Sequence, residues 1–486
     1  LQEAQRGGTK TLAPLMGLAW RELGATFPEV FPPKAPERLA DHRVKHLNER
    51  DAPPPKGGVV RLGPNFGFVG PATLPTDPRF SRLFVTTLEG VARCPWQTFV
   101  RRVLRVEPPR DDLDALATLD ATHIGSTVHR FLELVVQRSS DPTEEPPAAQ
   151  PKRHLAALEK GSSHQREPRD IPWPAPEIEA RLLERAATET LQKEAIPHPE
   201  LAPLLTTLCR PLLRQARELE WAGDELRACL GAELTGRHTW TPRDPELQRG
   251  QAPDNRPLQG VEVSRRDLYF RADRVDLERD GRLAFTDYKT GKPPTTSGKE
   301  AKYLQEVEQG RLLQGVVYAK SQAPPGRGRY VYLDPEKCPL EHAAFVMDPA
   351  RPAWDALETA FQKTCETLMA SWQGGLFLPR LVQPLKLNKE GKPCSYCEVK
   401  EACLYGDSSS KRRLVLWAKA MGSRVQGSTE DEPSAPSLSP LEASLWRLWQ
   451  LACPSNKRQR KETKSARKGS RRHGSVRSKS QREDES

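Results

Sequence analysis

The chain has 486 residues, of which 36% are hydrophobic and 46 are Pro. This length allows two or three domains, and the Pro content means that a sizeable part lies outside a packed core. The sequence has neither a run of about 18 apolar residues nor a signal-peptide pattern, so we expect neither a membrane span nor secretion.

The formal net charge of +11 is unevenly distributed along the chain. Residues 455–486 hold twelve Lys or Arg against four Asp or Glu, so this end supplies most of the excess. Such a composition favours a solvated, disordered tail that can contact phosphates without sequence preference. The rest of the chain is close to neutral, and its charge is therefore weak evidence for nucleic-acid binding.

The N-terminal segment, residues 1–84, predicts one helix near Leu12–Leu23 followed by Pro-rich connections. We interpret this segment as the possible end of a preceding domain. Residue 1 is Leu rather than Met, which is compatible with a fragment of a longer chain. The sequence contains no GxxxxGK[ST] loop, so we expect no NTP-hydrolysing motor in this stretch.

Ordered structure is predicted from Thr86, where Thr86-x-x-Glu89 forms a capping box before a helix that continues to Val103. A second helix is expected over Gly125–Val136. The Pro- and charge-rich stretch Ser139–Pro176 indicates an exposed insertion, and Ile178–Leu230 is mostly helical. Together, residues 139–230 form a predicted helical or exposed insertion.

Strands alternate with helices in the following part of the chain. A helix is expected at Tyr303–Lys320 and another at Trp354–Trp372. The predicted strands are Ala232–Thr241, Asp267–Leu277, Leu283–Lys289, Gly328–Leu333 and Ala343–Met347. This mixture predicts an α/β domain over residues 85–405. Residues 406–486 are interpreted as a low-complexity basic tail, mostly disordered, with one short apolar helix at Leu441–Leu451.

The two central strands form a hairpin that carries two acids and a base. Side chains alternate along a strand, so Leu283, Phe285, Asp287 and Lys289 share a face that starts apolar and ends charged. A two-residue loop would put Asp273 opposite Tyr288, on the other face. A three-residue loop, Arg279–Gly281 with Gly281 left-handed, would put Asp273 opposite Asp287. We predict the second register, because only it brings two carboxylates together.

Two convergent carboxylates suit a hard cation such as Mg²⁺ or Mn²⁺, and a neighbouring Lys can orient a water and offset phosphate charge. An ordinary surface hairpin with an Asp–Lys pair is the simpler alternative, because a bare D-x-K pattern is common. The surrounding motifs favour the metal site.

The pattern Asp273-x13-Asp287-x-Lys289, with DYKTG at Asp287–Gly291, resembles the RecB-like form of the PD-(D/E)XK nucleases. Two further elements of that family occur in the expected order. They are Gly125-x3-His129-x3-Glu133 upstream and Gln314-x3-Tyr318 downstream. Glu233 loosely matches an upstream acidic position, and Phe270 replaces the Gly that the family usually has before its first metal Asp.

The resemblance implies a mixed sheet flanked by helices, as in restriction endonucleases, and roles for these residues. Asp273, Asp287, His129 and the Tyr288 carbonyl would hold the metal, and Lys289 would position the water. Gln314 and Tyr318 would lie against the DNA strand.

A cysteine cluster, Cys394-x2-Cys397-x5-Cys403, follows the last predicted helix. Three thiols need a fourth ligand for either a [4Fe–4S] centre or tetrahedral zinc, and Cys94 is our candidate. The arrangement of one Cys before the core and three after it resembles the iron–sulfur site of AddB-type nucleases. That resemblance implies a structural [4Fe–4S] cluster, and zinc is the alternative.

The sequence therefore predicts a metal-dependent deoxyribonuclease, most similar to the C-terminal domain of AddB-like helicase–nuclease subunits. The resemblance implies an exonuclease in DNA end processing, recombination and double-strand break repair. It also implies a helicase–nuclease partner subunit. The clustered cysteines and the lack of a signal peptide suggest a cytoplasmic protein. The alternatives are a noncatalytic DNA-end-binding scaffold and a stand-alone single-strand exonuclease.

Overall fold

The computed structural model divides into two compact units that interleave along the chain. One unit comprises Leu1–Gly70, Cys94–Pro108 and Gly375–Ser439, and the other comprises Pro71–Arg93, Pro109–Gly374 and Pro440–Ser486. The structure describes residues 60, 62, 66–72, 74–107, 119–137, 168–194, 196–221, 228–243, 263–427 and 440–453. The helix predicted at 12–23 lies outside these residues. So do residues 139–167, 195 and 222–227 of the predicted insertion and residues 428–439 and 454–486 of the predicted tail. None of the helices described in these ranges combines the length and apolar character needed to cross a bilayer.

The second of these units, here called the sheet unit, is built on a mixed seven-stranded sheet. Its strands follow the order β2-β3-β4-β5-β6-β7, with the short β1 pairing in parallel with β4. The strands are β1 (Leu83–Phe84), β2 (Arg169–Asp170), β3 (Ala228–Trp240), β4 (Arg266–Leu277), β5 (Leu283–Lys289), β6 (Arg327–Tyr332) and β7 (Ala344–Met347). Among the strand pairs of the described residues, β5–β6 and β1–β4 are parallel and the others in this sheet are antiparallel. The predicted α/β class and mixed sheet flanked by helices are confirmed.

The β4–β5 hairpin has the predicted register. Arg274 pairs with Thr286 and Leu277 with Leu283, so Asp273 and Asp287 are the next opposed residues. The Glu278 N–H donates to the Arg282 carbonyl at 2.9 Å, which leaves residues 279–281 as a three-residue loop. Gly281 has φ 78°, a left-handed conformation that costs Gly little because it has no Cβ. The local turn chemistry therefore brings the two carboxylates side by side.

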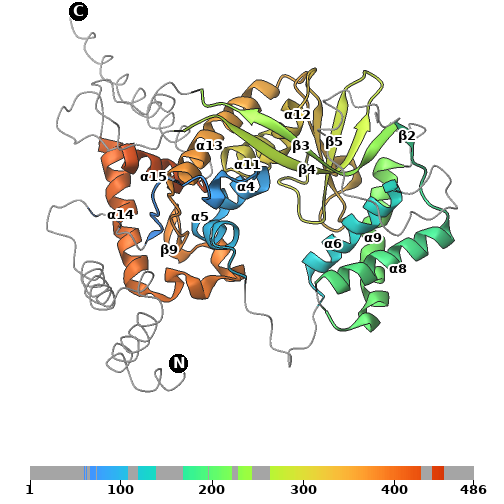
Figure 1. The fold of residues 1–486 in the computed structure, drawn as a ribbon, viewed down its shortest axis with the longest axis horizontal. Coiled ribbons are helices and arrows are strands. Elements are labelled where there is room, and N and C mark those ends of the chain that lie inside the picture. The colour runs from blue at the N-terminus through green and yellow to red at the C-terminus, as the bar shows by residue number, and fades with distance from the viewer. Residues whose placement is uncertain are drawn as a thin grey trace, which may run out of the picture. The chain divides into compact units, whose positions relative to one another are not determined.

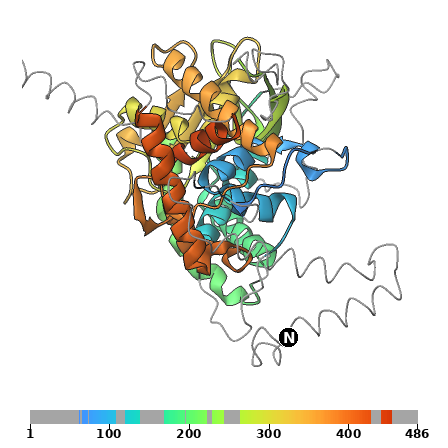
Figure 2. The ribbon, with the colours of Figure 1, turned by 90° about the vertical axis from the view of Figure 1, so that its left-hand side faces the viewer.

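Three helices cover one side of this sheet. They are α6 (Ala121–Gln137), α8 (Pro176–Lys193) and α9 (Ala202–Glu220), and they pack on one another, as Figures 1 and 2 show. The 3-10 turn η4 (Pro199–Leu201) separates α8 from α9 at the predicted Pro-rich break. Their apolar residues form one core with Tyr288 of β5, Val331 of β6 and Leu333, which follows β6. A large part of the predicted helical insertion thus completes the hydrophobic core.

Buried charges lie in this same interface, which the sequence analysis did not foresee. Arg274 Nε donates to Asp276 Oδ1 at 2.7 Å, and Arg329 Nη2 donates to Glu220 Oε1 at 2.6 Å. The Arg274 guanidinium also lies 4.8 Å from the ring centroid of Trp221, a cation–π arrangement. Because buried charges need partners, Glu220 at the end of α9 couples this helix to β6 through Arg329 and, at 3.8 Å, to β4 through Arg274.

The other helices of the sheet unit include the two that follow β5. Their bounds are α4 (Val85–Arg93), α11 (Glu300–Glu308), α12 (Leu313–Lys320), α13 (Trp354–Gly374) and α15 (Pro440–Gln450), with 3-10 turns η2 (Pro78–Phe80) and η5 (Leu340–His342). Helix α12 packs against β5, β6 and α4. The single helix predicted at Tyr303–Lys320 is wrong, because the chain breaks between α11 and α12. Gly310 has φ 74°, and a Cβ there would lie 2.4 Å from Ala92 Cβ, so the break also permits close packing.

The helix predicted from Thr86 to Val103 is also interrupted. Helix α4 ends at Arg93, and Cys94 is extended with φ −155° and ψ 106° before Pro95. A residue before Pro avoids the helical conformation, because the proline ring clashes with its backbone. The chain then resumes as α5 (Pro95–Thr98) and the π-helical turn η3 (Phe99–Val103).

The remaining unit, here called the cysteine unit, contains α5, η3 and the segment Gly375–Ser439 that follows α13. Its other elements are β8 (Val382–Gln383), β9 (Lys386–Glu390), η6 (Lys392–Tyr396), η7 (Lys400–Ala402), η8 (Leu404–Gly406) and α14 (Ser408–Gly427). Phe99 stacks on Phe377 at 4.7 Å, and the Trp96 indole donates to the Ala402 carbonyl at 2.9 Å. The low-complexity tail was predicted to start at 406, but α14 buries Leu414 and Trp417. The apolar helix expected at Leu441–Leu451 is confirmed as α15.

Candidate active site and cysteine pocket

Two acids and one base meet at the end of the hairpin, in the sheet unit. Lys289 forms an ion pair with Asp287, whose side chain is only 8% exposed. The Tyr288 N–H donates to Asp273 Oδ2 at 2.7 Å, which fixes that carboxylate beside β5. Burial raises the pKa of Asp287; Lys289 opposes the rise and Asp273 adds to it. The two carboxylates are therefore close enough to repel each other, as ligands of a shared cation would be.

Helix α6 brings His129 to the same place. Its Nδ1 lies 3.2 Å from Asp273 Oδ2. Gly125 leaves room for this approach, because an added Cβ would lie 3.1 Å from Thr290 Oγ1 in the loop after β5. Burial lowers the pKa of His129. The carboxylates of Asp273 and Asp287 outweigh this effect and raise the pKa of His129 to about 9. In the metal-free protein, His129 and Lys289 thus balance two carboxylates with two positive charges.

The His129 pair predicts a pH-dependent stability of the metal-free protein. The folded-state pKa of about 9 lies above the ordinary value of 6.5, so the stabilising contribution is complete below pH 6.5 and is lost as the pH rises through 9. Melting temperatures measured in EDTA from pH 6 to 9.5 should therefore fall more steeply for the wild type than for His129→Gln. Parallel curves would contradict the pairing.

The donor set of this site fits a hard divalent cation. Carboxylate oxygens are the ligands that Mg²⁺ and Mn²⁺ prefer, and a neutral imidazole can complete such a set. Within the described ranges, no three His, Cys, Asp or Glu side chains are grouped as a preformed metal site. His129 pairs with Asp273 and Lys289 pairs with Asp287 in this structure. A cation bound between the two carboxylates would compete with both pairs, and an imidazole ligand would have to be neutral.

Glu233, which the sequence matched only loosely, lies at the rim of this site. It has a left-handed φ of 53°, rare for a residue with a side chain, next to an irregularity in β3. Its carboxylate pairs with Arg271 Nε at 2.7 Å. Burial, reinforced by Asp273, raises the pKa of Glu233 to about 7. The pairing of β3 with β4 places Glu233 between the partners of Arg274 and Ala272, beside Asp273, and its ion pair is with Arg271.

Gln314 and Tyr318 do not have the placement expected for contact with DNA. Tyr318 is fully buried and Gln314 is 6% exposed. The Gln314 amide and the Tyr318 hydroxyl donate to the same backbone carbonyl, that of Arg271, at 3.0 and 2.9 Å. This corrects the sequence-based role. Gln314 and Tyr318 are one turn apart on α12, so both side chains reach the same carbonyl, that of Arg271. They therefore hold β4 at a point two residues before Asp273.

Glu89 is a buried acid whose role the sequence analysis missed. It was interpreted as part of a capping box, but α4 begins at Val85, before Thr86. Glu89 Oε1 instead accepts the N–H groups of Leu313 at 2.7 Å and Gln314 at 3.2 Å. Burial raises the pKa of Glu89, and the Lys289 ammonium opposes the rise. No local signal reveals this role, because the partners lie 224 and 225 residues away.

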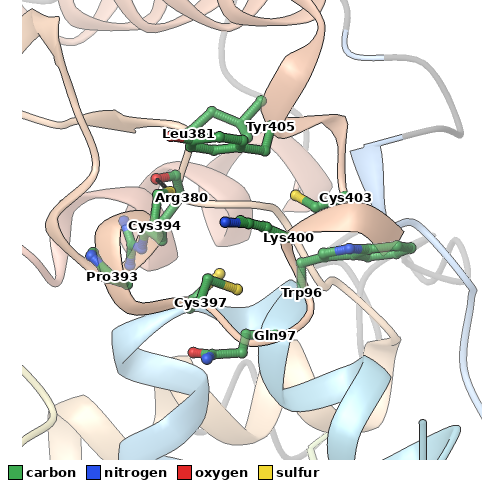
Figure 3. A pocket seen from close by; sticks show the side chains of 11 residues that line it. Trp96, Gln97, Arg380, Leu381, Pro393, Cys394, Cys397, Lys400, Cys403 and Tyr405 are labelled. Atoms are coloured by element: carbon green, nitrogen blue, oxygen red, sulfur yellow. Dashed lines mark hydrogen bonds between the residues drawn. The ribbon is translucent and has the colours of Figure 1, made fainter. Parts of the chain in front are cut away.

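The four cysteines that the sequence singled out line one pocket of the cysteine unit. Cys94, Cys394, Cys397 and Cys403 all contribute to its wall. Figure 3 shows Cys394, Cys397 and Cys403 around a common space, into which the Lys400 side chain reaches. Burial, reinforced by Cys94, raises the pKa of both Cys394 and Cys403 to about 12. The pocket therefore brings together four thiols from two segments that are 300 residues apart in the sequence.

The other side chains of this pocket suit an anionic group. Arg380 is 3% exposed and lines the wall, as does Lys400. A metal centre held by four thiolates would carry excess negative charge, which a buried guanidinium beside it would offset. Cys209, Cys229, Cys338 and Cys365 are buried elsewhere and do not line this pocket.

Comparison with known proteins agrees with this geometry. Residues 82–404 match the PD-(D/E)XK nuclease superfamily. No curated protein matches the chain. The matched range contains the mixed sheet, the Asp273–Asp287–Lys289 hairpin, His129 and all four pocket cysteines. The chain therefore belongs to the PD-(D/E)XK nuclease superfamily.

Proposed function

We propose that this protein is a divalent-metal-dependent deoxyribonuclease whose active centre is formed by Asp273, Asp287, Lys289 and His129. Family membership implies a nuclease. The observation that carries the proposal is the convergence of these four side chains from α6, β4 and β5 in the one register that permits it.

Each residue has a role in the proposed hydrolysis. Asp273, Asp287, His129 and the Tyr288 carbonyl would hold Mg²⁺ or Mn²⁺, which would activate water and neutralise charge on the phosphate. Lys289 would orient the attacking water by hydrogen bonding and keep positive charge near the phosphate. Gln314 and Tyr318 would keep β4 in place. Hydrolysis by in-line attack depends mainly on such positioning and charge neutralisation.

The activity is tested on end-labelled linear DNA and on circular DNA, each in single-stranded and double-stranded form. Each substrate is incubated with the protein in the presence of Mg²⁺ or of EDTA. An exonuclease should release label from linear substrates only, and only with Mg²⁺. Binding to DNA ends without cleavage in the presence of Mg²⁺ would favour the noncatalytic scaffold.

The finer assignment is an AddB-like exonuclease that acts at DNA ends in recombination and double-strand break repair with a helicase subunit. The order of the motifs around Asp273–Lys289 and the placement of the four cysteines on both sides of the core support it. Co-purification of a helicase with the tagged protein would agree with this assignment. Full exonuclease activity without any copurifying helicase would favour the stand-alone enzyme.

We also propose that Cys94, Cys394, Cys397 and Cys403 hold a structural [4Fe–4S] cluster, with zinc as the alternative. The shared pocket and its buried Arg380 support a thiolate-bound metal centre of either kind. Anaerobically purified protein should show broad visible absorbance and about four iron atoms per chain, as a [4Fe–4S] centre requires. Colourless protein with one zinc would reject the iron–sulfur assignment.

Replacing a pocket cysteine should destabilise the protein. We expect Cys403→Ser to lower both the metal content and the melting temperature, because the cross-link between Cys94 and residues 394–403 constrains a 300-residue loop of the unfolded chain. Cys453→Ser, outside the pocket, is the control and should retain both. A Cys403→Ser protein with full metal content and an unchanged melting temperature would contradict the cross-link.

A further inference from the structure

Strand β4 has an open face that leads along the strand to the proposed active centre. The strand pairs with β5 only over Arg274–Leu277, whereas its pairing with β3 continues back to Arg266 (Figure 1). In that extension the side chains of Tyr269 and Arg271 reach solvent, and the residues that alternate with them are buried. Asp273, two residues after Arg271, continues the same alternation.

Two aromatic rings lie on this face, four residues before Asp273. Phe84 of β1 is the register partner of Tyr269 in the parallel β1–β4 pair, so the two side chains point to the same side of the sheet. Their ring centroids are 6.1 Å apart, with the ring planes tilted by 47°. Phe84 remains 36% exposed, whereas the preceding residue, Leu83, is buried. The two rings are therefore available for contact from outside rather than part of the core.

The segment that carries Phe84 is tied to the rest of the sheet unit. Arg266 Nη2 donates to the carbonyls of Arg79 and Ser81, just before β1. The Trp372 indole donates to the same Arg79 carbonyl at 3.1 Å. The two rings are thus held in place before any ligand arrives, and a preorganised surface loses less conformational freedom on binding.

Guanidinium groups surround the two rings. That of Arg82 lies 5.5 Å from the Tyr269 ring centroid. Arg237 is the register partner of Tyr269 on β3, and its side chain is 50% exposed, while that of Arg271 is 55% exposed. Arg237 and Arg271 each pair with one carboxylate, at 3.3 and 2.7 Å. Exposed ion pairs are weak, so a phosphate can compete for these guanidinium groups.

Exposed rings beside Arg side chains suit a single-stranded nucleic acid, whose bases stack on the rings while its phosphates pair with the Arg. We propose that this face, formed by Arg82, Phe84, Arg237, Tyr269 and Arg271, is a track that guides a single DNA strand into the active centre. The proposal rests on the proposed nuclease function, whose substrate strand it names.

The spacing defines which part of the strand uses the rings. Four residues of extended chain separate Tyr269 from Asp273, which is about 13 Å. At about 3.4 Å for each stacked nucleotide, the rings would hold bases about four nucleotides from the bond that is cut. A duplex would not gain from the rings, because its bases are already stacked on one another.

Binding is measured in EDTA, without cleavage, by the fluorescence anisotropy of a labelled oligothymidylate of about twelve nucleotides. Phe84→Leu and Tyr269→Leu keep apolar bulk but remove a ring, so the melting temperature should not change. Each should raise Kd for the single strand about 10-fold, the effect of one lost base–aromatic stack. Kd for a blunt duplex of the same length should stay within about 2-fold of the wild type. Tyr396→Leu, 87% exposed and outside the lining of the cysteine pocket, is the matched control.

The guanidinium groups are tested by salt dependence. Arg82→Gln should lower the slope of log K against log salt concentration by about 0.7, the value for one phosphate contact on a single strand. With Mg²⁺, the ring variants should raise KM for linear single-stranded DNA about 10-fold and leave kcat unchanged, because the rings lie away from the scissile bond.

Wild-type Kd for the oligothymidylate in both ring variants would overturn the proposal. Equal weakening of single-strand and duplex binding would also overturn it, because the rings would then serve only to shape the surface. A wild type that binds the oligothymidylate through these rings but does not cleave DNA with Mg²⁺ would instead refute the nuclease function and leave the binding track standing.

Discussion

Asp287→Ala and Lys289→Ala should each lower Mg²⁺-dependent DNA cleavage by at least about 10³-fold while the protein stays folded. The first substitution would remove the carboxylate that is proposed to bind the metal. The second would remove the ammonium that is proposed to orient the water. Folding should persist because the ends of the hairpin are held separately. Asp273 keeps its hydrogen bond from the Tyr288 N–H, and Arg271 keeps its bonds from Gln314 and Tyr318.

The measurement is initial cleavage rate on end-labelled DNA at saturating Mg²⁺, together with circular dichroism and a melting curve for each variant. Asp355→Ala and Lys363→Ala, both exposed on α13, are the matched controls for loss of an acid and a base. They should cleave at the wild-type rate. Cleavage by Asp287→Ala or Lys289→Ala within about 3-fold of the wild type would exclude the proposed mechanism.

Glu220→Ala should destabilise the protein by about 3–5 kcal/mol, the range found when one partner of a buried ion pair is removed. The Glu220 side chain is fully buried at the end of α9. It pairs with Arg329 at 2.6 Å and lies 3.8 Å from Arg274, whose side chain is 2% exposed. Its removal would leave two buried guanidinium groups with Asp276 as their remaining acidic partner in this network. Burying excess charge in a low-dielectric core is what makes the change costly.

The free energy of unfolding is measured by urea denaturation followed by circular dichroism, with equal m-values required for the comparison. Glu218→Ala, exposed two residues earlier on the same helix, should change the free energy by less than about 0.5 kcal/mol. A loss of less than about 1 kcal/mol in Glu220→Ala would show that the ion pairs add little to the packing of α9 on the sheet.

The ion pairs of Glu220 also affect the proposed active centre, because Arg329, the partner of Glu220, contacts β5. Arg329 donates to Thr286 Oγ1 at 3.0 Å, and Thr286 is the residue before Asp287. The Tyr288 ring is buried in the core with α6, α8 and α9, while its N–H holds Asp273. The strand that presents Asp287 and Lys289 is thus fixed by charges on one side and by α12 on the other. A loss of Glu220 is therefore expected to loosen the site as well as the fold.

The amino-acid sequence by itself determined the hairpin and what it carries. Strand alternation and the need for a left-handed Gly281 were sufficient to place Asp273 beside Asp287, because both rules act over a few residues of backbone. The strands and most helices were also predictable from their periodicity. Two helices were predicted as continuous where the chain in fact breaks. In each case a single residue, Pro95 or Gly310, interrupts the helical pattern.

The tertiary structure alone decided which distant groups support that hairpin. Glu89 resembled a helix cap until its partners at Leu313 and Gln314 were known, and Tyr318 resembled a DNA contact until its burial was known. The Glu220 ion pairs join residues more than 50 positions apart, and nothing in the local sequence marks them as partners. The physical reason is that periodicity and turn chemistry are properties of neighbouring residues, whereas burial and charge pairing depend on which segments the fold brings together.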